Sequence, residues 1–233
     1  MPGRLAIYDD IEFKQDISNI FHNFDDKIQI LHKKYNISPT LDIPIFTNKM
    51  IYTYGKFGLI PSWANGKKNF NINARSETLL EKSSFKEPFK TKRGIVPVNG
   101  YYEWVKDPFS KQSIPYMIHS LRKTYLGIAA IYDYWYDNTI DHTLLTISLI
   151  TTQPNSIIEP IHQRMPVILE QKDWKLWLDQ NSSFHQLSQL FTPICSDLLK
   201  ITKVNSCVNS VKNNSPLSIQ ESNNIIMRQP SLF

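Results

Sequence analysis

Short segments rich in strand-forming residues fill the middle of this chain and restrict its fold more than any other feature. Isoleucine, valine, tyrosine, phenylalanine and threonine dominate these segments, and such residues fit the pleated backbone of a β-strand. Turn-forming pairs such as Asn65-Gly66 and Asp137-Asn138 separate them, which favours pairing between neighbouring strands. The predicted strands are 51–60, 94–104, 115–120, 125–132 and 144–152.

Helices are predicted to flank this strand-rich region. From residue 10 to residue 34, apolar side chains recur every three or four positions and would share one helix face, and Tyr35 to Pro39 would end that helix. Residues 172–180 and 184–191 are predicted as two shorter helices, and 200–211 as a returning strand. The sequence therefore predicts an α+β fold, with one domain built on a largely antiparallel sheet.

Composition limits the class of protein. With 233 residues, of which 41% are hydrophobic, the chain can bury a sizeable core within one domain. No apolar run approaches the roughly 18 residues of a membrane helix, and the first residues lack the apolar block of a secretion signal. We therefore expect a soluble, cytoplasmic protein without a membrane partner. The net charge of +5 permits a nucleic-acid partner without proving one.

Cysteine and histidine spacing gives no sign of a metal site. Cys195 and Cys207 are too few for a disulfide scaffold and are expected to be reduced thiols. Neither a His-Glu-x-x-His pattern nor the spacing of a Ser-His-Asp triad is visible. The sequence predicts no metal and no other cofactor.

Four segments combine functional side chains with turn residues: the N-terminus, 73–78, 99–104 and 161–166. Each has a structural interpretation beside a functional one. A carboxylate such as Glu103 can pair with a buried arginine, and a lone histidine such as His162 is often only a hydrogen-bonded structural residue. Arg75 and Arg164 can be ion-pair partners, and Asn73 can cap a turn. Taken singly, these residues leave both interpretations open.

Taken together, the segments and their surroundings form an ordered set of motifs. The set is Met1-x-Gly3-Arg4, Tyr35-Asn36-x-x-Pro39, Trp63, Asn73-Ala74-Arg75-x-Glu77-Thr78, Pro97-x-x-Gly100-x-Tyr102-Glu103-Trp104, Ile161-His162-x-Arg164-Met165-Pro166 and Val208-Asn209. It strongly resembles the SRAP family, the SOS-response-associated peptidase-like proteins that crosslink to abasic sites in single-stranded DNA. The resemblance spans nearly the whole chain.

The resemblance implies a twisted, barrel-like β fold with flanking helices and a basic cleft for single-stranded DNA. It also implies a DNA-damage-response protein associated with the nucleoid, and nothing in the sequence demands more than a monomer. The family's active-site asparagine, glutamate and histidine match Asn73, Glu103 and His162. Motif residues expected near the DNA match Arg4, Trp63, Arg75 and Arg164.

The chemistry of an abasic site agrees with these residues. The abasic sugar exists partly as an open aldehyde, and an unprotonated amine attacks that aldehyde to form a Schiff base. An α-amino group, with a reference pKa of about 7.7–8.0, suits neutral pH better than lysine at about 10.4. Glu103 can take and return protons, His162 can donate one as the sugar ring opens, and Asn73 can orient the adduct.

Position 2 departs from the family pattern. The family's nucleophile is a cysteine at position 2, exposed when Met1 is removed, whose amine forms the imine and whose thiol then closes a thiazolidine ring. This chain has Pro2. Three hypotheses follow: Pro2 is itself the nucleophile and forms a cationic iminium, the protein binds DNA without reacting, or another group acts. The retained Asn73, Glu103 and His162 favour the first.

The C-terminal segment carries a separate signal. The chain ends in Gln-Pro-Ser-Leu-Phe, which resembles the short peptide by which bacterial repair and replication proteins bind the β sliding clamp. Gln229 would form a hydrogen bond at one sub-site, and Leu232 and Phe233 would fill an apolar pocket. The alternative is an unstructured end, or an end that folds back onto the core. We predict a domain over 1–214 and a polar tail over 215–233.

Three functions from different classes fit the sequence. The first is an enzyme-like repair factor that forms a covalent adduct with abasic single-stranded DNA, with possible strand cleavage by a lyase-type step. The second is a non-catalytic binder of single-stranded DNA or strand junctions, docked to the sliding clamp. The third is a peptidase, which ranks lowest because no protease nucleophile is evident without the N-terminal cysteine.

Overall fold

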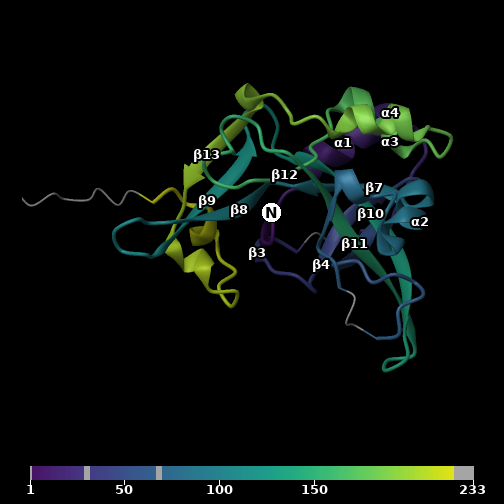
Figure 1. Cartoon of the computed structure of the whole chain (residues 1–233), viewed down its shortest axis with the longest axis horizontal. Coiled ribbons are helices and arrows are strands. Elements are labelled where there is room, and N and C mark those ends of the chain that lie inside the picture. The colour runs from purple at the N-terminus through teal and green to yellow at the C-terminus, as the bar shows by residue number, and fades with distance from the viewer. Residues whose placement is uncertain (1, 29–31, 67–69, 223–233) are drawn as a thin grey trace, which may run out of the picture.

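The computed structural model describes residues 2–28, 32–66 and 70–222, and two β-sheets form its framework (Figure 1). The first sheet has five strands in the order β13-β9-β8-β1-β3. These strands are β1 (Leu5–Ile7), β3 (Lys34–Ile37), β8 (Gly100–Lys106), β9 (Ser113–Ser120) and β13 (Leu199–Lys203). The N-terminal strand β1 therefore lies inside this sheet, with β8 on one side and β3 on the other.

The second sheet closes on itself. Its strands are β2 (Asp25–Asp26), β4 (Asp42–Thr47), β5 (Ile51–Phe57), β6 (Asn73–Arg75), β7 (Arg93–Val98), β10 (Leu126–Asp137), β11 (His142–Thr152) and β12 (Met165–Pro166). Strand β11 pairs with β10 on one side and with β5 on the other, so β5, β4, β7, β10 and β11 form a closed ring. Most pairings are antiparallel, which confirms the predicted α+β class with a largely antiparallel, barrel-like sheet.

Alternation along the strands divides the core into an inner and an outer part. Val96 and Val98 of β7 join the cluster inside the barrel, whereas Ile95, which precedes them, joins the cluster outside it. Leu5 and Tyr101 of the first sheet also belong to the inner cluster. The two sheets therefore share one core, and the N-terminal strand is part of it.

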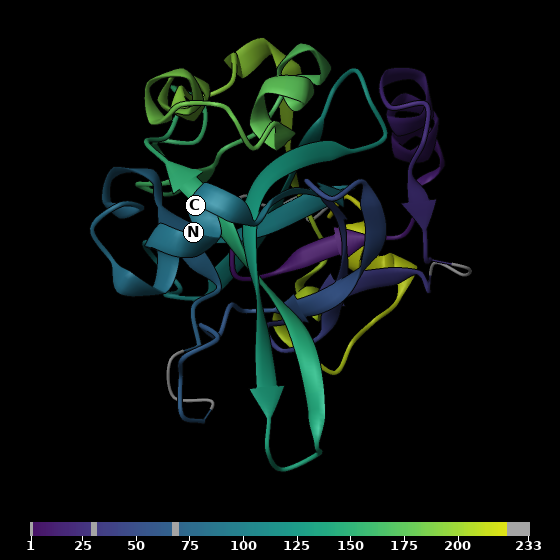
Figure 2. The same ribbon diagram turned by 90° about the vertical axis from the view of Figure 1, so that its right-hand side faces the viewer.

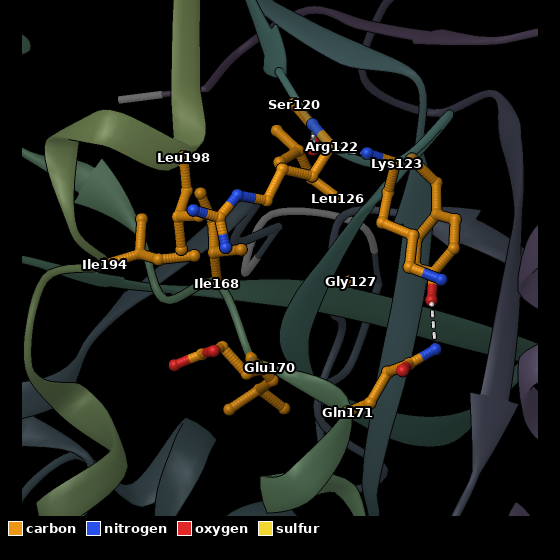
Figure 3. A pocket seen from close by; sticks show the side chains of 12 residues that line it. Ser120, Arg122, Lys123, Leu126, Gly127, Ile168, Glu170, Gln171, Ile194 and Leu198 are labelled. Carbon is orange, nitrogen blue, oxygen red and sulfur yellow. Dashed lines mark hydrogen bonds between the residues drawn. The ribbon is translucent and has the colours of Figure 1, made fainter.

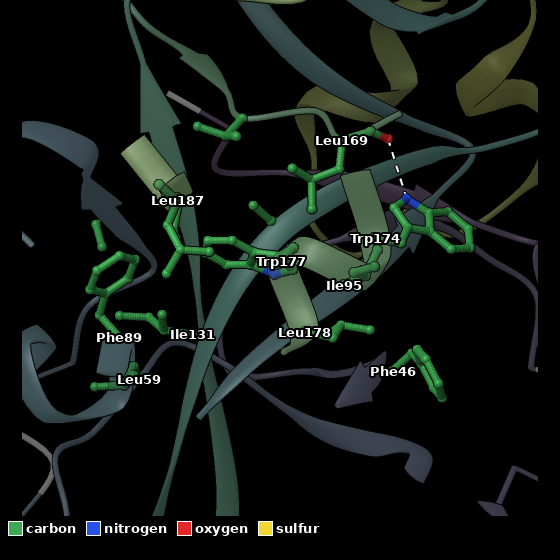
Figure 4. Packing of buried hydrophobic residues seen from close by; sticks show 14 of the residues in the cluster. Phe46, Leu59, Phe89, Ile95, Ile131, Leu169, Trp174, Trp177, Leu178 and Leu187 are labelled. Carbon is green, nitrogen blue, oxygen red and sulfur yellow. Dashed lines mark hydrogen bonds between the residues drawn. The ribbon is translucent and has the colours of Figure 1, made fainter. Parts of the chain in front are cut away.

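Four helices cover the outer face of the barrel: α1 (Ile11–Ile20), α2 (Ser83–Thr91), α3 (Trp174–Leu178) and α4 (Phe184–Ser188). Two fully buried indole rings, Trp174 and Trp177, connect these helices to the sheet (Figure 4). Trp177 donates a hydrogen bond from Nε1 to the carbonyl of Gly94, 2.9 Å away. A hydrogen bond therefore attaches α3 to β7 in addition to the apolar packing.

The long helix predicted over residues 10–34 is wrong. The helix ends at Ile20, and the residues that follow contribute β2 and β3 instead. Phe21 and Phe24 have the spacing of a helix face, which led to the prediction. In the structure they lie beyond the helix, and their rings pack on Phe46 of the barrel. Tertiary packing on the barrel has therefore overridden the local pattern.

Other predicted elements have different bounds. The predicted strand 94–104 is two strands in different sheets, separated at Asn99, whose Oδ1 accepts hydrogen bonds from the amides of Tyr8 and Asp9. The predicted strand 200–211 ends at Lys203 and continues as a 3-10 turn over Ser206–Asn209. The predicted hairpin strands 125–132 and 144–152 extend further, and β10 and β11 project beyond the barrel (Figure 2).

The first residues of the polar C-terminal segment pack on the domain. A 3-10 turn over Pro216–Ile219 places Ile219 against the cluster that contains Tyr102 and Val208, and Ser218 is fully buried. Glu221 then forms a β-bridge with Val204. Ordered structure therefore reaches Ser222, beyond position 214.

Arg93 connects two helix ends to the barrel through hydrogen bonds to backbone carbonyls. It is 1% exposed, and its guanidinium donates hydrogen bonds to the carbonyls of Trp177, Phe89, Lys90 and Asp179. Arg93→Met is expected to lower the free energy of unfolding by about 3–5 kcal/mol, because several buried carbonyls would lose their donors. Urea unfolding measures this change. The matched control is the exposed Arg122→Met, which is expected to stay within about 0.5 kcal/mol of wild type.

Candidate active site

The register of the first sheet brings the N-terminus to Glu103. Leu5 lies opposite Tyr101, and the amide of Tyr102 donates a hydrogen bond to the carbonyl of Arg4, 3.0 Å away. Continued by two residues, this antiparallel register places Gly3 opposite Glu103. Glu103 is 6% exposed and Pro2 is buried, so both residues are largely shielded from solvent.

Asn73 connects the N-terminus to the barrel. It begins β6, which runs parallel to β11 with Asn73 opposite Leu149. Its Nδ2 donates a hydrogen bond to the carbonyl of Pro2 at 3.2 Å, and Pro2 is buried. The Oδ1 of Asn73 is also buried and accepts no hydrogen bond from any described residue. The amide group therefore holds residue 2 with one end and keeps a free acceptor at the other.

His162 lies in the loop between β11 and β12. Its Nδ1 lies 3.0 Å from the amide nitrogen of Arg164 and 3.2 Å from the carbonyl oxygen of the same residue. In the tautomer whose Nδ1 accepts from the amide, the shorter of the two contacts, the ring proton is on Nε2. The amide of His162 donates to the carbonyl of Ile158, which fixes the backbone of the loop. With its proton on Nε2, the half-buried imidazole is arranged as a donor.

Arg164 fastens this loop to the segment that follows β6. Its two terminal nitrogens bind the two carboxylate oxygens of Glu77 at 2.6 and 2.8 Å, and Nη2 also donates to the carbonyl of Thr151. Thr151 of β11 pairs with Arg75 on one side and with Pro166 on the other. The end of β11 therefore gathers the Asn73 strand and the His162 loop at one place.

The ion pair between Glu77 and Arg164 is sensitive to acid. The hydrogen bond from Arg164 holds the pKa of Glu77 below its usual value. A carboxyl group with a lowered pKa in the folded state stabilises that state above its ordinary pKa. The contribution disappears as the pH falls through the lowered value. The connection between the His162 loop and β6 is therefore present at neutral pH and is lost in acid.

The residues matched to DNA contacts differ in their surroundings. Arg75 is exposed on β6, and Trp63 is 56% exposed in a turn where the amide of Ser62 donates to Asp133. Arg164, by contrast, is occupied by Glu77. The two exposed residues can meet a nucleic acid without breaking contacts within the protein.

Arg4 has its partners on the other face of the first sheet. Its guanidinium donates to Oδ1 of Asn36 at 2.7 Å and to the carbonyl of Val208 at 3.0 Å, and it lies over the ring of Trp104. Asn36 in turn donates from Nδ2 to the carbonyls of Val208, Ser210 and Asn213. Sequence reasoning missed this network, although Asn36 and Val208 both occur in the motifs.

The predicted clamp-binding residues cannot be compared with this site. Gln229, Leu232 and Phe233, assigned to a clamp-binding peptide, lie outside the described residues. A cavity of about 190 Å³ lies elsewhere, between the β9–β10 loop and the segments around Ile168 and Ile194, and no predicted site residue lines it (Figure 3).

The described residues show neither a metal-ligand cluster nor a membrane-spanning helix. In residues 2–28, 32–66 and 70–222, no group of metal-ligating side chains was found, and no helix long and apolar enough to cross a membrane.

Comparison with known proteins agrees with the motif pattern. The family model described as SOS response associated peptidase (SRAP) matches residues 1–211. The chain belongs to the SRAP family. Within that family, it is 39% identical over 220 residues to abasic site processing protein YoqW of Bacillus subtilis (strain 168), a match that covers 86% of this chain and 96% of the relative.

Two matches of lower sequence identity also cover most of this chain. Abasic site processing protein HMCES of Rattus norvegicus is 28% identical over 239 residues, which cover 84% of this chain and 67% of that protein. An X-ray crystal structure of a protein from Bacteroides thetaiotaomicron matches with a TM-score of 0.82 at 27% identity. That alignment covers 94% of this chain and 99% of the other, so the similarity of fold extends over nearly the whole chain.

Proposed function

We propose that this chain processes abasic sites in single-stranded DNA, and that it does so by a covalent adduct through the α-amine of Pro2. The observation that carries the proposal is the position of residue 2, which Asn73 holds beside the strand of Glu103. The printed names of YoqW and HMCES, both abasic site processing proteins, support the same substrate.

The proposed reaction uses the aldehyde form of the abasic sugar. After Met1 is removed, the secondary amine of Pro2 attacks the aldehyde carbon, and loss of the resulting hydroxyl as water leaves a cationic iminium. Glu103 takes the proton that the amine releases and returns a proton to the departing hydroxyl. His162 donates from Nε2 to the ring oxygen as the sugar opens, and Asn73 accepts a hydrogen bond at Oδ1.

The iminium has two ways to react further. Water can add back to it and release the sugar unchanged. Alternatively, loss of a proton next to the iminium carbon expels the 3′ phosphate, which cuts the strand. Because Pro2 has no thiol, neither route ends in a ring-closed product. The adduct is therefore expected to be short-lived.

Intact-mass spectrometry tests the proposal directly. The protein is mixed with abasic single-stranded DNA, with and without borohydride, which reduces the iminium to a stable amine. A mass that lacks Met1 and gains the DNA only after reduction supports the adduct. A mass that lacks Met1 and gains no DNA under either condition would show a protein that only binds DNA, and the covalent proposal would be abandoned.

The exposed Arg75 tests the proposed DNA path. Arg75→Ala is expected to weaken DNA binding about three- to tenfold at low salt, because one phosphate contact is lost. The slope of log affinity against log salt concentration is expected to become shallower by about one. Fluorescence anisotropy over a series of salt concentrations measures both quantities. Arg122→Ala, a change at another exposed arginine, serves as the control. If the Arg75 and Arg122 variants behave alike, the DNA follows another surface.

A further inference from the structure

The tip of the β8–β9 hairpin carries an aromatic ring that the adduct chemistry does not use. Phe109 is 94% exposed, the largest exposed fraction of the large hydrophobic side chains in the described part of the chain. The hairpin extends outward from the first sheet (Figure 1). Its tip therefore presents an apolar ring to solvent, away from both hydrophobic clusters of the barrel.

Hydrogen bonds hold the tip in one shape. Oδ1 of Asp107 accepts from the amides of Phe109 at 2.9 Å and Ser110 at 2.7 Å, and the amide of Asp107 donates to the carbonyl of Gln112. The amides of Ser110 and Phe109 lower the pKa of Asp107, so its carboxylate remains ionised at neutral pH and keeps both bonds. The ring of Phe109 is thus presented from a fixed loop.

Lysines occur on both sides of Phe109 in the hairpin tip. Lys106 and Lys111 flank the tip and are exposed, and Lys203 of the neighbouring β13 acts on Asp107 electrostatically. The carboxylate of Asp107 is directed to backbone amides and is not paired with any of these lysines. An exposed aromatic ring among cations is the combination by which proteins bind single-stranded nucleic acid, with the ring on a base and the cations on phosphates.

The same strand connects the tip to the site. From Glu103 to Lys106, β8 advances by about 10 Å, at ~3.3 Å per residue, and the turn adds roughly 5–10 Å. At ~3.4 Å per stacked nucleotide, this distance corresponds to about four to six nucleotides. A strand whose abasic sugar lies at Glu103 can therefore reach Phe109 with its neighbouring bases.

We propose that Phe109 stacks on an unpaired base about four to six nucleotides from the abasic sugar, while the lysines of the tip contact the adjoining phosphates. The inference rests on the proposed function, since it assumes that the abasic sugar occupies the site at Glu103. It adds a substrate requirement. The DNA must remain single-stranded for several nucleotides on one side of the lesion.

A base analogue tests the stacking. Oligonucleotides would contain tetrahydrofuran, which mimics the abasic sugar but cannot open to an aldehyde, and one 2-aminopurine at increasing distance on either side. The fluorescence of 2-aminopurine falls when the base stacks. With the wild-type protein, we expect quenching on one side only, at about four to six nucleotides. Phe109→Ala should abolish it, and Phe109→Trp should preserve it.

Affinity gives a second readout. Phe109→Ala should bind oligonucleotides that reach the tip about 5- to 100-fold more weakly, and should bind shorter ones as the wild type does. Ile140→Ala, a change at an exposed apolar residue of the β10–β11 hairpin, is the matched control and should change neither quantity. Equal quenching and equal affinity in the wild type and in Phe109→Ala would overturn the stacking inference and leave the proposed function standing. A wild-type protein that binds none of these oligonucleotides would overturn the proposed function as well.

Discussion

The Pro2→Cys protein is expected to form a DNA adduct that persists without reduction, whereas the wild-type adduct is expected to persist only after borohydride. Cysteine at position 2 supplies an amine and a thiol on adjacent carbons, so the thiol can add to the imine and close a five-membered ring. Well-oriented intramolecular reactions reach effective concentrations on the order of 10⁵ M, so we expect the adduct lifetime to rise by at least about a hundredfold. Denaturing gel electrophoresis after heating, without borohydride, measures that lifetime.

Two controls separate the thiol from the amine. Pro2→Ser offers a primary amine without a thiol and should give only an adduct that borohydride traps. Acetylation of the wild-type N-terminal amine should remove the adduct entirely, because an amide nitrogen does not attack an aldehyde. If Pro2→Cys loses Met1, folds and still forms no lasting adduct, the N-terminus does not meet the abasic sugar. If Pro2→Cys reacts but the wild type cannot be trapped, the site binds abasic DNA and has lost its nucleophile.

Glu103→Gln is expected to slow adduct formation by about 10²- to 10³-fold and to leave DNA affinity within about twofold of wild type. Glutamine keeps the shape of the side chain but cannot carry a proton between the amine and the departing hydroxyl. Single-turnover trapping with borohydride gives the rate, and anisotropy with the tetrahydrofuran oligonucleotide gives the affinity.

The matched control for this change is Glu81→Gln, at an exposed glutamate outside the site. Because Glu103 is buried, thermal unfolding of Glu103→Gln is measured alongside, so that a loss of rate is not confused with a loss of fold. Equal rates for the Glu81 and Glu103 variants would exclude proton transfer by Glu103.

Local patterns predicted the strands because strand propensity and turn residues act over a few neighbours. They failed where a distant partner decided the structure. Phe21 and Phe24 have helical spacing, yet their packing on Phe46 suits a non-helical chain equally well. Asn99 bends the chain from one sheet into the other through bonds to Tyr8 and to Asp9, which precede it by about ninety residues. No short window contains that information.

The site shows the same limit. Motif resemblance named Asn73, Glu103 and His162 as candidates, but the contact between Asn73 and Pro2 depends on how two sheets meet. The position of Arg4 could not be predicted from the sequence for a related reason. Strand register places it opposite Tyr102, on the face away from Glu103, and a shift of one residue would reverse that choice.

The central position of β1 has a consequence for synthesis of the protein. The N-terminal strand leaves the ribosome first, but its partner β8 is completed only at Lys106, which at ~5–20 residues per second means a delay of about 5–20 s. The strand β11, which positions β6 and the His162 loop, follows later still. During this interval the N-terminus is open to the enzyme that removes Met1, and afterwards Pro2 is buried. On the proposed mechanism, Met1 has to be removed before the first sheet closes, and chains that fold earlier would keep Met1 and form no adduct.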